Sequence, residues 1–361
     1  MNQTTDSPLL RMTQTTPTAL WNDSANPVEL ANAIGWGAVG ATCNPVIALT
    51  ALRADFPIWS KRIRTISLER PLATDSEIGW QLVRELSIQA AELLHPRFVE
   101  HGGRNGRLSI QTDPRLHRDI SAMADQAEEF SGLAANIIVK IPVTETGVAA
   151  IEEATFRGVS INATVSFTLP QALAVGAAVE RGLKRREAAG LPIGSMGPVC
   201  TIMVGRLDDW VRLTAQRDGA AIDPAAFDWA GVAVFKKAYQ IFQERGYRVR
   251  LLSAAFRNHM HWSELVGGDV VISPPYEWQV RLNESGLEPV SRIFEPVAPA
   301  ILDALYAGSN EFRKAYDEDG LSPAEFVDYG ASRRTLRQFL AATNELEAFV
   351  RDVTIPDPDA D

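Results

Sequence analysis

The 361-residue sequence predicts an α/β fold of the (β/α)8, or TIM, barrel class, and three observations lead to this prediction. Short apolar runs rich in β-branched residues alternate with longer helical patterns, as in βα units around a parallel sheet. There are eight such runs, the number that a closed barrel needs. The composition, with 46% hydrophobic and 22% charged residues, is that of a globular chain and not of a disordered or coiled-coil one.

The predicted strands are the eight apolar runs, taken in order along the chain. They cover residues 18–21, 39–43, 107–110, 136–141, 160–165, 198–203, 248–253 and 269–272. Helical patterns between them cover residues 77–94, 115–130, 147–157, 169–189, 229–245 and 262–266. Two helical stretches exceed a minimal βα unit, at residues 49–106 and 276–350. We therefore expect extra helices between strands two and three, and a helical C-terminal extension that caps or closes the barrel.

The length fits one barrel with additions. A typical barrel has about 250 residues, and the two long helical stretches and two loose ends account for the excess. We therefore predict a single domain over residues 1–361. Residues 1–17 are polar and threonine-rich, which predicts a loose N-terminal arm, and residues 353–361 are rich in proline and aspartate, which predicts a disordered acidic tail.

The net charge limits the classes of partner. The chain carries 35 basic and 45 acidic residues, a formal charge of −10, which argues against general attraction to nucleic acid or anionic lipid. No apolar run approaches the roughly 18 residues of a membrane span. Two cysteines cannot form a disulfide framework, which fits a reducing compartment. We expect a cytoplasmic protein that binds small molecules, with no nucleic-acid or membrane partner, and that holds any anionic ligand with a few placed arginines.

One glycine motif does not predict nucleotide binding. Residues 35–40 satisfy the G-x-G-x-x-G pattern, and Asp55 lies 20 residues after the first glycine. In dinucleotide-binding folds this fingerprint leaves a strand and opens a helix. Here the motif follows a helical pattern at residues 28–34 and leads into a strand, so we interpret it as a helix end and a turn.

A lysine lies near the end of the apolar fourth strand, in the run NIIVKIPVT of residues 136–144. Burial disfavours the charged ammonium, and a shift of its pKa from about 10.4 toward 7–8 costs roughly 3–5 kcal/mol. A fold accepts that cost mainly where a neutral, nucleophilic amine is useful. Alternatively, Lys140 is a strand-end lysine whose stem packs while its ammonium reaches water. This segment by itself favours the second interpretation, because lysines at strand ends are common.

Polar side chains suited to carbonyl chemistry lie at the carboxyl end of nearly every predicted strand. In a (β/α)8 barrel these positions converge on one mouth, where active sites lie. Each residue singly is often a helix cap or a turn residue, but the whole set is hard to explain in that way. The set comprises Asn22, Asp23, Ser24, Thr42, Asn44, Gln111, Asp113, Lys140, Asn162, Thr164, Thr201, Arg206, Ser253 and Arg257.

Eight motifs, in order along the chain, together resemble those of the transaldolase family of Schiff-base enzymes. They are LWNDS (20–24), GATCNP (40–45), SIQTDPR (109–115), VKIPVTETG (139–147), INATVSF (161–167), VGRLDDW (204–210), SAAFRN (253–258) and DVVISPP (269–275). The resemblance implies a circularly shifted aldolase barrel with its lysine on strand four, and with no metal and no organic cofactor. The implied activity is transfer of a dihydroxyacetone unit from a ketose phosphate to an aldose phosphate, in the pentose phosphate pathway.

The resemblance also implies roles for individual residues. Lys140 matches the lysine that forms an imine with the ketose carbonyl, and Asp23 matches the carboxylate that acts as general acid and base. Thr164 matches a threonine that helps to hold a catalytic water. Substrate-binding positions are implied for Asn44, Asn162, Thr201, Ser253 and the two phosphate-binding arginines, Arg206 and Arg257.

Three positions depart from the family pattern. Gln111 stands where transaldolases usually carry a glutamate, and a glutamine can orient a water but cannot take its proton. Glutamine resembles the fructose-6-phosphate aldolase branch, yet that branch has a tyrosine at the position of Met203. Ala255 replaces a serine, which removes a hydroxyl near the expected phosphate site. A lyase that releases free dihydroxyacetone is therefore an alternative, and so is a sugar-phosphate binding protein with degraded catalysis.

A metal site is not expected. His259 and His261 form an H-x-H pair, but two residues apart on a helix their side chains diverge. We therefore predict full activity in the presence of a chelator. The sequence carries no signal for an oligomeric state.

Overall fold

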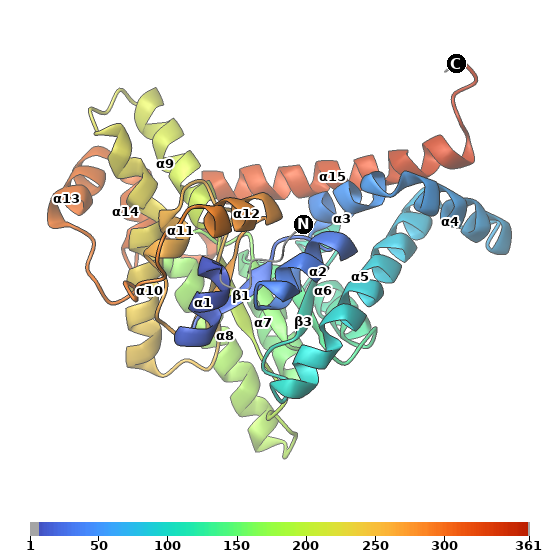
Figure 1. The fold of residues 1–361 in the computed structure, drawn as a ribbon, viewed down its shortest axis with the longest axis horizontal. Coiled ribbons are helices and arrows are strands. Elements are labelled where there is room, and N and C mark those ends of the chain that lie inside the picture. The colour runs from blue at the N-terminus through green and yellow to red at the C-terminus, as the bar shows by residue number, and fades with distance from the viewer. Residues whose placement is uncertain (1–6, 360–361) are drawn as a thin grey trace.

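The computed structural model describes residues 7–359, and in it eight parallel strands close into a barrel in chain order (Figure 1). The strands are β1 (Ala19–Asn22), β2 (Ala38–Thr42), β3 (Arg107–Gln111), β4 (Ile137–Pro142), β5 (Ile161–Thr164), β6 (Val199–Ile202), β7 (Arg250–Ala254) and β8 (Val271–Ser273). Each begins and ends within two residues of its predicted range. The prediction of a (β/α)8 barrel is confirmed.

Helices surround the barrel. They are α1 (Pro8–Thr15), α2 (Pro27–Gly35), α3 (Pro45–Ala54), α4 (Phe56–Glu69), α5 (Asp75–Glu100), α6 (Ile120–Ser131), α7 (Glu145–Arg157), α8 (Leu169–Ala188), α9 (Val204–Arg217), α10 (Ala230–Arg245), α11 (Met260–Ser263), α12 (Tyr276–Glu284), α13 (Pro299–Gly308), α14 (Asn310–Tyr316) and α15 (Gly330–Thr354). The helix expected from residue 115 instead starts as a 3-10 turn, Pro114–Leu116, because Asp119 caps α6 only from Ile120 onward. The helix expected at residues 262–266 is α11, which ends earlier, at Ser263.

The barrel interior has its own small core, separate from the larger core between the sheet and the helices. Strand side chains alternate between the two faces of the sheet, and the inward ones form a cluster of Ala19, Trp21, Ile138, Val199, Leu252, Ala254 and Val271. Trp21 fills this space so closely that a Cβ atom on Gly40 would lie 2.4 Å from its ring. Polar inward side chains are therefore confined to the two ends of the barrel.

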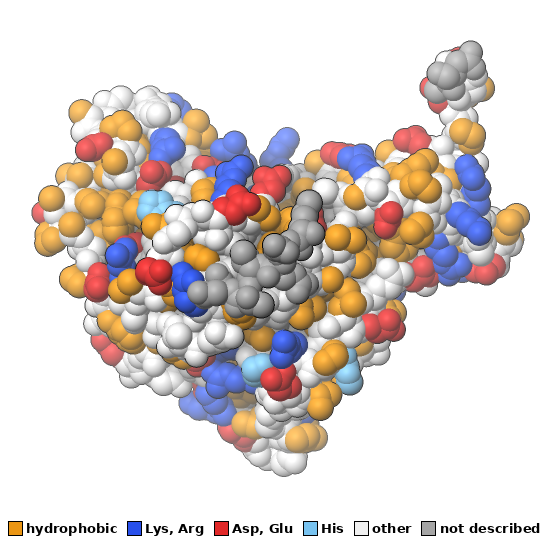
Figure 2. Space-filling model, in the orientation of Figure 1, with side chains coloured by type: hydrophobic (Ala, Val, Ile, Leu, Met, Phe, Trp, Pro, Cys, Tyr) orange, Lys and Arg blue, Asp and Glu red, His pale blue; other side chains and the backbone are white. Residues whose placement is uncertain are grey.

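The two long helical stretches extend the molecule at both sides: Figure 1 shows α4 at one side and α13 and α14 at the other. Three helices, α3 to α5, lie between β2 and β3, and four, α12 to α15, follow β8. Figure 1 shows α15 crossing the molecule from α9 to α4, and it contacts α3 and α5 on the way. α4 lies at the outer end of this extension, where Figure 2 shows hydrophobic side chains beside Lys and Arg; Ile58, Leu68 and Leu72 are exposed there.

The prediction of a loose N-terminal arm is wrong for residues 8–15, which form α1; residues 1–6 lie outside the described part of the chain. Leu9 and Met12 are buried, and Trp262 Nε1 donates to Met12 Sδ at 3.0 Å. Ser7 caps the helix by accepting from the N–H of Leu10. Two apolar side chains three residues apart lie on one helix face, and their burial anchors a segment whose composition is mostly polar.

The predicted acidic tail also starts too early. α15 continues to Thr354 and buries Val353, because this last turn packs its apolar side chain inward. Residues 355–359 have no helix or strand, and residues 360–361 lie outside the described part. The assignment of the chain to a single domain stays a prediction.

The glycine motif has the predicted structure. Gly35 is the last residue of α2, Gly37 has a φ of +92°, and β2 begins at Ala38. The motif therefore ends a helix and enters a strand, the reverse of a dinucleotide-binding loop. Separately, none of the helices within residues 7–359 is both long enough and apolar enough to cross a membrane.

Candidate active site

A cavity of about 170 Å³ opens at the carboxyl ends of the strands. Seven of the ten predicted site residues line it, and they come from β4, β5 and β6 and from the segments after β1, β2, β6 and β7. They are Asp23, Asn44, Lys140, Thr164, Thr201, Arg206 and Arg257, with Thr42, Met203 and Pro275 among the other lining residues. The structure therefore brings most of the predicted set to one place.

Lys140 lies on β4, where its register partners are Gln111 on β3 and Asn162 on β5. Its side chain is only 5% exposed, and its ammonium has no hydrogen bond or ion pair within residues 7–359. Burial lowers the pKa of Lys140, and the charge of Arg206 lowers it further, while Asp23 and Cys43 oppose the shift. Because the charged form is disfavoured, this amine is suited to act as a nucleophile.

Asp23 follows β1 and faces the same cavity. Thr42 Oγ1 donates a short hydrogen bond to Asp23 Oδ1, and the N–H of Asp23 donates to Pro274 O at 3.2 Å. Within residues 7–359 no hydrogen bond or ion pair uses Oδ2. The carboxylate is thus oriented by one oxygen and leaves the other available for a proton. Thr42 is among the polar residues predicted at strand ends, but no role is predicted for it.

Asn162 lies just below the cavity in a buried chain of hydrogen bonds. Its Nδ2 donates to Ser109 Oγ at 3.1 Å, and Thr201 Oγ1 donates to its Oδ1 at 2.8 Å. Asn162 is fully buried and does not line the cavity, whereas Thr201 does. Asn162 therefore supports Thr201 from beneath. Ser109, which sequence reasoning missed, lies on β3 two residues before Gln111.

Asn44 has a second task besides lining the cavity. Its Oδ1 accepts from the N–H groups of Val46 and Ile47, so it is the N-cap of α3. An N-cap oxygen satisfies donors that the helix itself cannot. Only the Nδ2 group is left to face a ligand.

Gln111 is not on the wall of the main cavity. It lines a separate, smaller space between β3, α5 and α15, next to Cys43, Trp80 and Thr343. Its Oε1 is buried without a hydrogen-bond partner in the described structure. A buried amide oxygen without a donor is costly, so this position has an unused acceptor one strand away from Lys140.

Two arginines border the cavity on the side of α15. Arg206, in the first turn of α9, donates through Nη1 to Thr335 Oγ1 at 3.0 Å and Gln338 Oε1 at 2.7 Å. Arg257 follows β7, and its Nε donates to Asp209 Oδ2 at 2.9 Å. Both arginines also line an adjoining cavity of about 340 Å³. Positive charge is therefore concentrated at one side of the mouth.

The C-terminal helix supplies site residues that the sequence did not indicate. Thr335 and Gln338 on α15 hold Arg206, and Arg334 lines the adjoining cavity. These residues follow the last predicted strand by more than 60 positions, and no local pattern links them to the mouth. Burial and the neighbouring charge of Arg257 lower the pKa of Arg206 to about 10, so it stays charged at neutral pH.

Ser253 does not lie on the wall of this cavity, and its assignment to substrate binding stays a prediction. Leu252 and Ala254 line the cavity, whereas Ser253 does not. Its Oγ donates to the carbonyl of His261 at 3.3 Å, on the other side of the strand. The reason is the two-residue alternation along β7, which turns a side chain at this position away from the barrel axis.

The H-x-H pair does not converge. His259 is exposed, while His261 is fully buried and contacts Asp208. Within residues 7–359, no three His, Cys, Asp or Glu side chains gather in a way that could hold a metal ion. The expectation of a metal-free enzyme stays a prediction.

Strained backbone marks two of the strand ends at the mouth. Val165, directly after β5, has a φ of +54°, and Ala255, directly after β7, has a φ of +64°. A β-branched residue rarely adopts this conformation, and such strain gathers at functional sites. The chain therefore turns sharply at the points where Thr164 and Arg257 are presented.

Known proteins resemble this chain over most of its length. The profile described as Transaldolase/Fructose-6-phosphate aldolase matches residues 20–347. Transaldolase from Thiobacillus denitrificans is 29% identical over 287 residues, which cover 73% of this chain and 79% of that protein. Transaldolase 1 from Streptomyces avermitilis is 30% identical over 208 residues, 57% of this chain and only 54% of the relative.

The family match covers most of the chain, and this extent is what assigns the chain to a family. It runs from β1 through most of α15 and so includes the strands and the helix that surround the cavity. The chain spans about half the length of the Streptomyces relative and about four fifths of the Thiobacillus one. This chain belongs to the Transaldolase/Fructose-6-phosphate aldolase family.

Proposed function

We propose that this protein is a transaldolase-type enzyme that moves a dihydroxyacetone unit from a ketose phosphate to an aldose phosphate through an imine on Lys140. The observation that carries this proposal is the state of Lys140. It is a buried amine without a hydrogen-bond partner in the described structure, in a cavity that also contains Asp23 and two arginines. A neutral amine, a carboxylate and an anion site are the three groups that this chemistry needs.

The reaction follows from the roles of Lys140 and Asp23. The neutral amine of Lys140 adds to the ketose carbonyl and water leaves, which forms the imine. Asp23 takes the proton from the hydroxyl beside the carbon–carbon bond that breaks. The aldehyde product leaves, and the electron pair of the broken bond stays on the lysine-bound three-carbon unit as an enamine. The enamine then attacks an acceptor aldehyde, Asp23 returns the proton to the new hydroxyl, and water releases the product.

The two arginines account for a phosphorylated substrate despite the net charge of −10. Their guanidinium groups present donors in the fork geometry that suits a phosphate. Arg206 and Arg257 both line the catalytic cavity and the adjoining one. A sugar with its carbonyl at Lys140 would therefore place a terminal phosphate at the side of the mouth next to α15.

Borohydride trapping tests the proposal directly. In the presence of a ketose phosphate, reduction should leave a stable three-carbon adduct on Lys140, which peptide mass analysis locates. Lys236 provides the matched control, because it is also buried but is held by Glu264 at 2.8 Å and lies outside the cavity. An adduct on another lysine, or no adduct at all, would overturn the proposal.

Transfer and simple cleavage are distinguished by their products. A donor ketose that is consumed only when an acceptor aldose is present supports transfer. Release of free dihydroxyacetone without an acceptor supports the lyase alternative, which Gln111 favours because it lacks the carboxylate usual in transaldolases. Binding of sugar phosphate with neither reaction would indicate the degraded binding protein.

The reaction uses side chains of the chain itself, so we expect no organic cofactor and full activity in a chelator. We also place the enzyme in the cytoplasm, in pentose phosphate metabolism, with no nucleic-acid or membrane partner. Activity that falls on treatment with EDTA and returns with a divalent cation would contradict the metal-free mechanism.

A further inference from the structure

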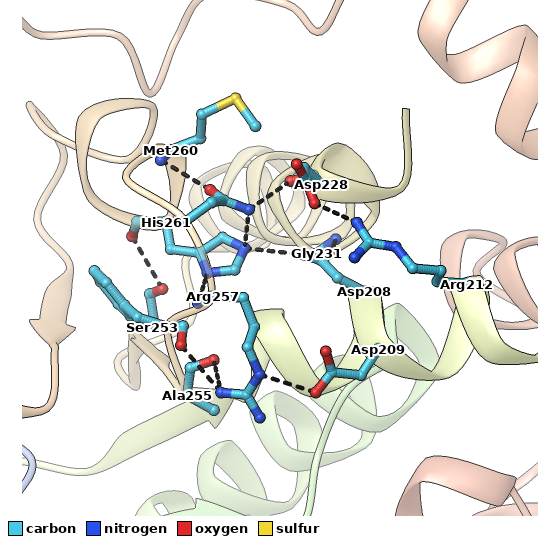
Figure 3. Close-up of polar contacts among 12 residues, drawn as sticks. Asp208, Asp209, Arg212, Asp228, Gly231, Ser253, Ala255, Arg257, Met260 and His261 are labelled. Carbon is cyan, nitrogen blue, oxygen red and sulfur yellow. Dashed lines mark hydrogen bonds and ion pairs between the residues drawn. The ribbon is translucent and has the colours of Figure 1, made fainter. Parts of the chain in front are cut away.

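A buried carboxylate–imidazole pair connects the two segments that carry the arginines. His261 Nε2 contacts Asp208 Oδ2 at 2.7 Å, and both side chains are almost completely buried (Figure 3). Asp208 lies two residues after Arg206 on α9, and His261 lies four residues after Arg257. Neither residue lines the catalytic cavity. The pair thus joins the two segments that carry the arginines without touching the space where substrate would bind.

The hydrogen bonds determine where the imidazole proton lies. The N–H of Arg257 donates to His261 Nδ1 at 3.0 Å, so this nitrogen must carry a lone pair. The ring proton is then on Nε2 and is donated to Asp208. Asp208 Oδ1 in turn accepts from the N–H of Gly231 at 2.8 Å. One carboxylate therefore selects the tautomer that holds the backbone of Arg257.

The backbone segments around Asp208 and His261 pack closely against one another. A Cβ atom on Gly205 would lie 2.1 Å from Ala255 O, and one on Gly231 would lie 2.4 Å from Val204 O. The first turn of α9 is therefore in contact with the loop after β7 and with the start of α10. A movement of Asp208 or His261 would be passed to Arg257, because these segments leave no space to absorb it.

A purely structural role explains this pair poorly. Burial raises the pKa of Asp208, which shows that the surroundings disfavour its charge. Replacing both partners of a buried hydrogen bond by apolar side chains of the same shape can be nearly neutral or stabilising. We propose that Asp208 and His261 are positioning residues that hold Arg257 against Arg206 and thereby determine the affinity for the phosphate of the substrate. This inference rests on the proposed function for the identity of the bound group.

The substitution Asp208→Asn tests the proposal through the tautomer. An amide can still accept from Gly231, but its NH2 group would face the Nε2 proton and favour the tautomer with the proton on Nδ1. That proton would oppose the N–H of Arg257. We expect KM for a ketose phosphate to rise about tenfold to a hundredfold, by analogy with the loss of hydrogen-bond partners that orient metal ligands. KM for the same ketose without its phosphate should change less than twofold, and trapping of dihydroxyacetone on Lys140 should persist.

Two substitutions of His261 separate positioning from packing. Asparagine can place an oxygen near the position of Nδ1 and accept from Arg257, whereas glutamine can reach toward Asp208 but offers nothing at that position. Binding of inorganic phosphate, measured by calorimetry, should therefore be weakened more by His261→Gln than by His261→Asn. The exposed neighbour supplies the control, His259→Asn, which should bind phosphate like the wild type.

The possible outcomes are distinct. If the variants lower the melting temperature but leave phosphate affinity and the ratio of the two KM values unchanged, the pair is structural and the proposal is overturned. The same conclusion follows if none of the Asp208 and His261 variants folds. If the wild type binds phosphate but shows no adduct on Lys140, the proposed function fails while the phosphate measurements still test the positioning.

Discussion

Both ends of the barrel contain buried basic side chains, but these side chains have hydrogen-bond partners at one end only. At the carboxyl end of the strands, the ammonium of Lys140 has no hydrogen-bond partner within residues 7–359. The amino end of the strands, where Arg107 and Arg250 lie, is called the floor of the barrel. There, Arg107 Nη2 donates to Ser195 O at 2.5 Å, and Arg250 Nη2 donates to Arg104 O at 3.1 Å and Asn105 Oδ1 at 3.0 Å.

The difference follows from the chemistry of the two side chains. Burial lowers the pKa of both Arg107 and Arg250 to about 10, which leaves them charged at neutral pH. They must therefore be given acceptors, and carbonyl groups at the floor supply most of these, although Arg107 Nε has no partner in the described structure. A lysine can lose its proton instead. Lys140, an amine without a hydrogen-bond partner in the described structure, thus indicates a functional role, whereas the hydrogen-bonded Arg107 and Arg250 indicate a structural one.

The largest expected effect is that of Lys140→Met. We expect complete loss of borohydride trapping and of turnover, because among residues 7–359 no other amine lines the cavity. The free energy of unfolding should rise by about 1 kcal/mol, since an apolar side chain replaces a buried amine in a functional site. Activity assays and thermal unfolding check both parts. A loss of stability in this variant would contradict the difference between the two ends, because Lys140 would then stabilise the fold as the floor arginines do.

That stability gain should depend on pH in a defined direction. The pKa of Lys140 is lower in the folded state than its ordinary value of 10.5, so the folded state binds fewer protons. The wild type is therefore penalised fully below the folded-state pKa, and the penalty disappears as pH rises toward 10.5. Lys140→Met and the wild type should accordingly converge in stability at high pH.

The next effect in size is that of Asp23→Asn. Turnover should fall about 10²- to 10⁴-fold, the usual contribution of a general acid–base group, while the imine on Lys140 still forms. Single-turnover trapping with dihydroxyacetone, beside steady-state kinetics, separates the two steps. Unchanged turnover would show that Asp23 is not the general acid–base group and that it serves only as a hydrogen-bond partner of Thr42.

At the floor, Arg250→Met should act on stability alone. Its removal leaves Arg104 O and Asn105 Oδ1 without their donor, which should cost about 1–3 kcal/mol. Neither KM nor kcat should change below the unfolding temperature. Chemical denaturation with parallel kinetics measures both, and a specific loss of activity in this variant would contradict the division between mouth and floor.

The smallest effect is a change in pH dependence. The charge of Arg206 lowers the pKa of Lys140, so Arg206→Met should raise it and leave less neutral amine at a given pH. The rate of imine formation with unphosphorylated dihydroxyacetone should then rise at a higher pH than in the wild type. Arg250→Met is the control and should leave this profile unchanged. A shift to lower pH would show that Arg206 acts on Lys140 in another way.

Local patterns predicted the barrel well, because each strand is defined by its own run of apolar residues. The same patterns predicted the ring of polar residues at the strand ends, and Lys140 among them, because parallel strands in a barrel end at one mouth. They did not predict the orientation of Ser253, which depends on the phase of alternation along β7. They also failed for α1, where two buried side chains outweigh a polar composition.

The sequence by itself determined the eight strands and placed a lysine and a carboxylate at the mouth, whereas the burial of Lys140 is seen only in the structure. Only the tertiary structure decided how the arginines are held. Thr335 and Gln338 reach Arg206 across about 130 residues of chain, and Asp208 meets His261 across 53. Contacts of this range leave no periodicity in the sequence, since they arise only when α9, α11 and α15 pack around the same end of the barrel.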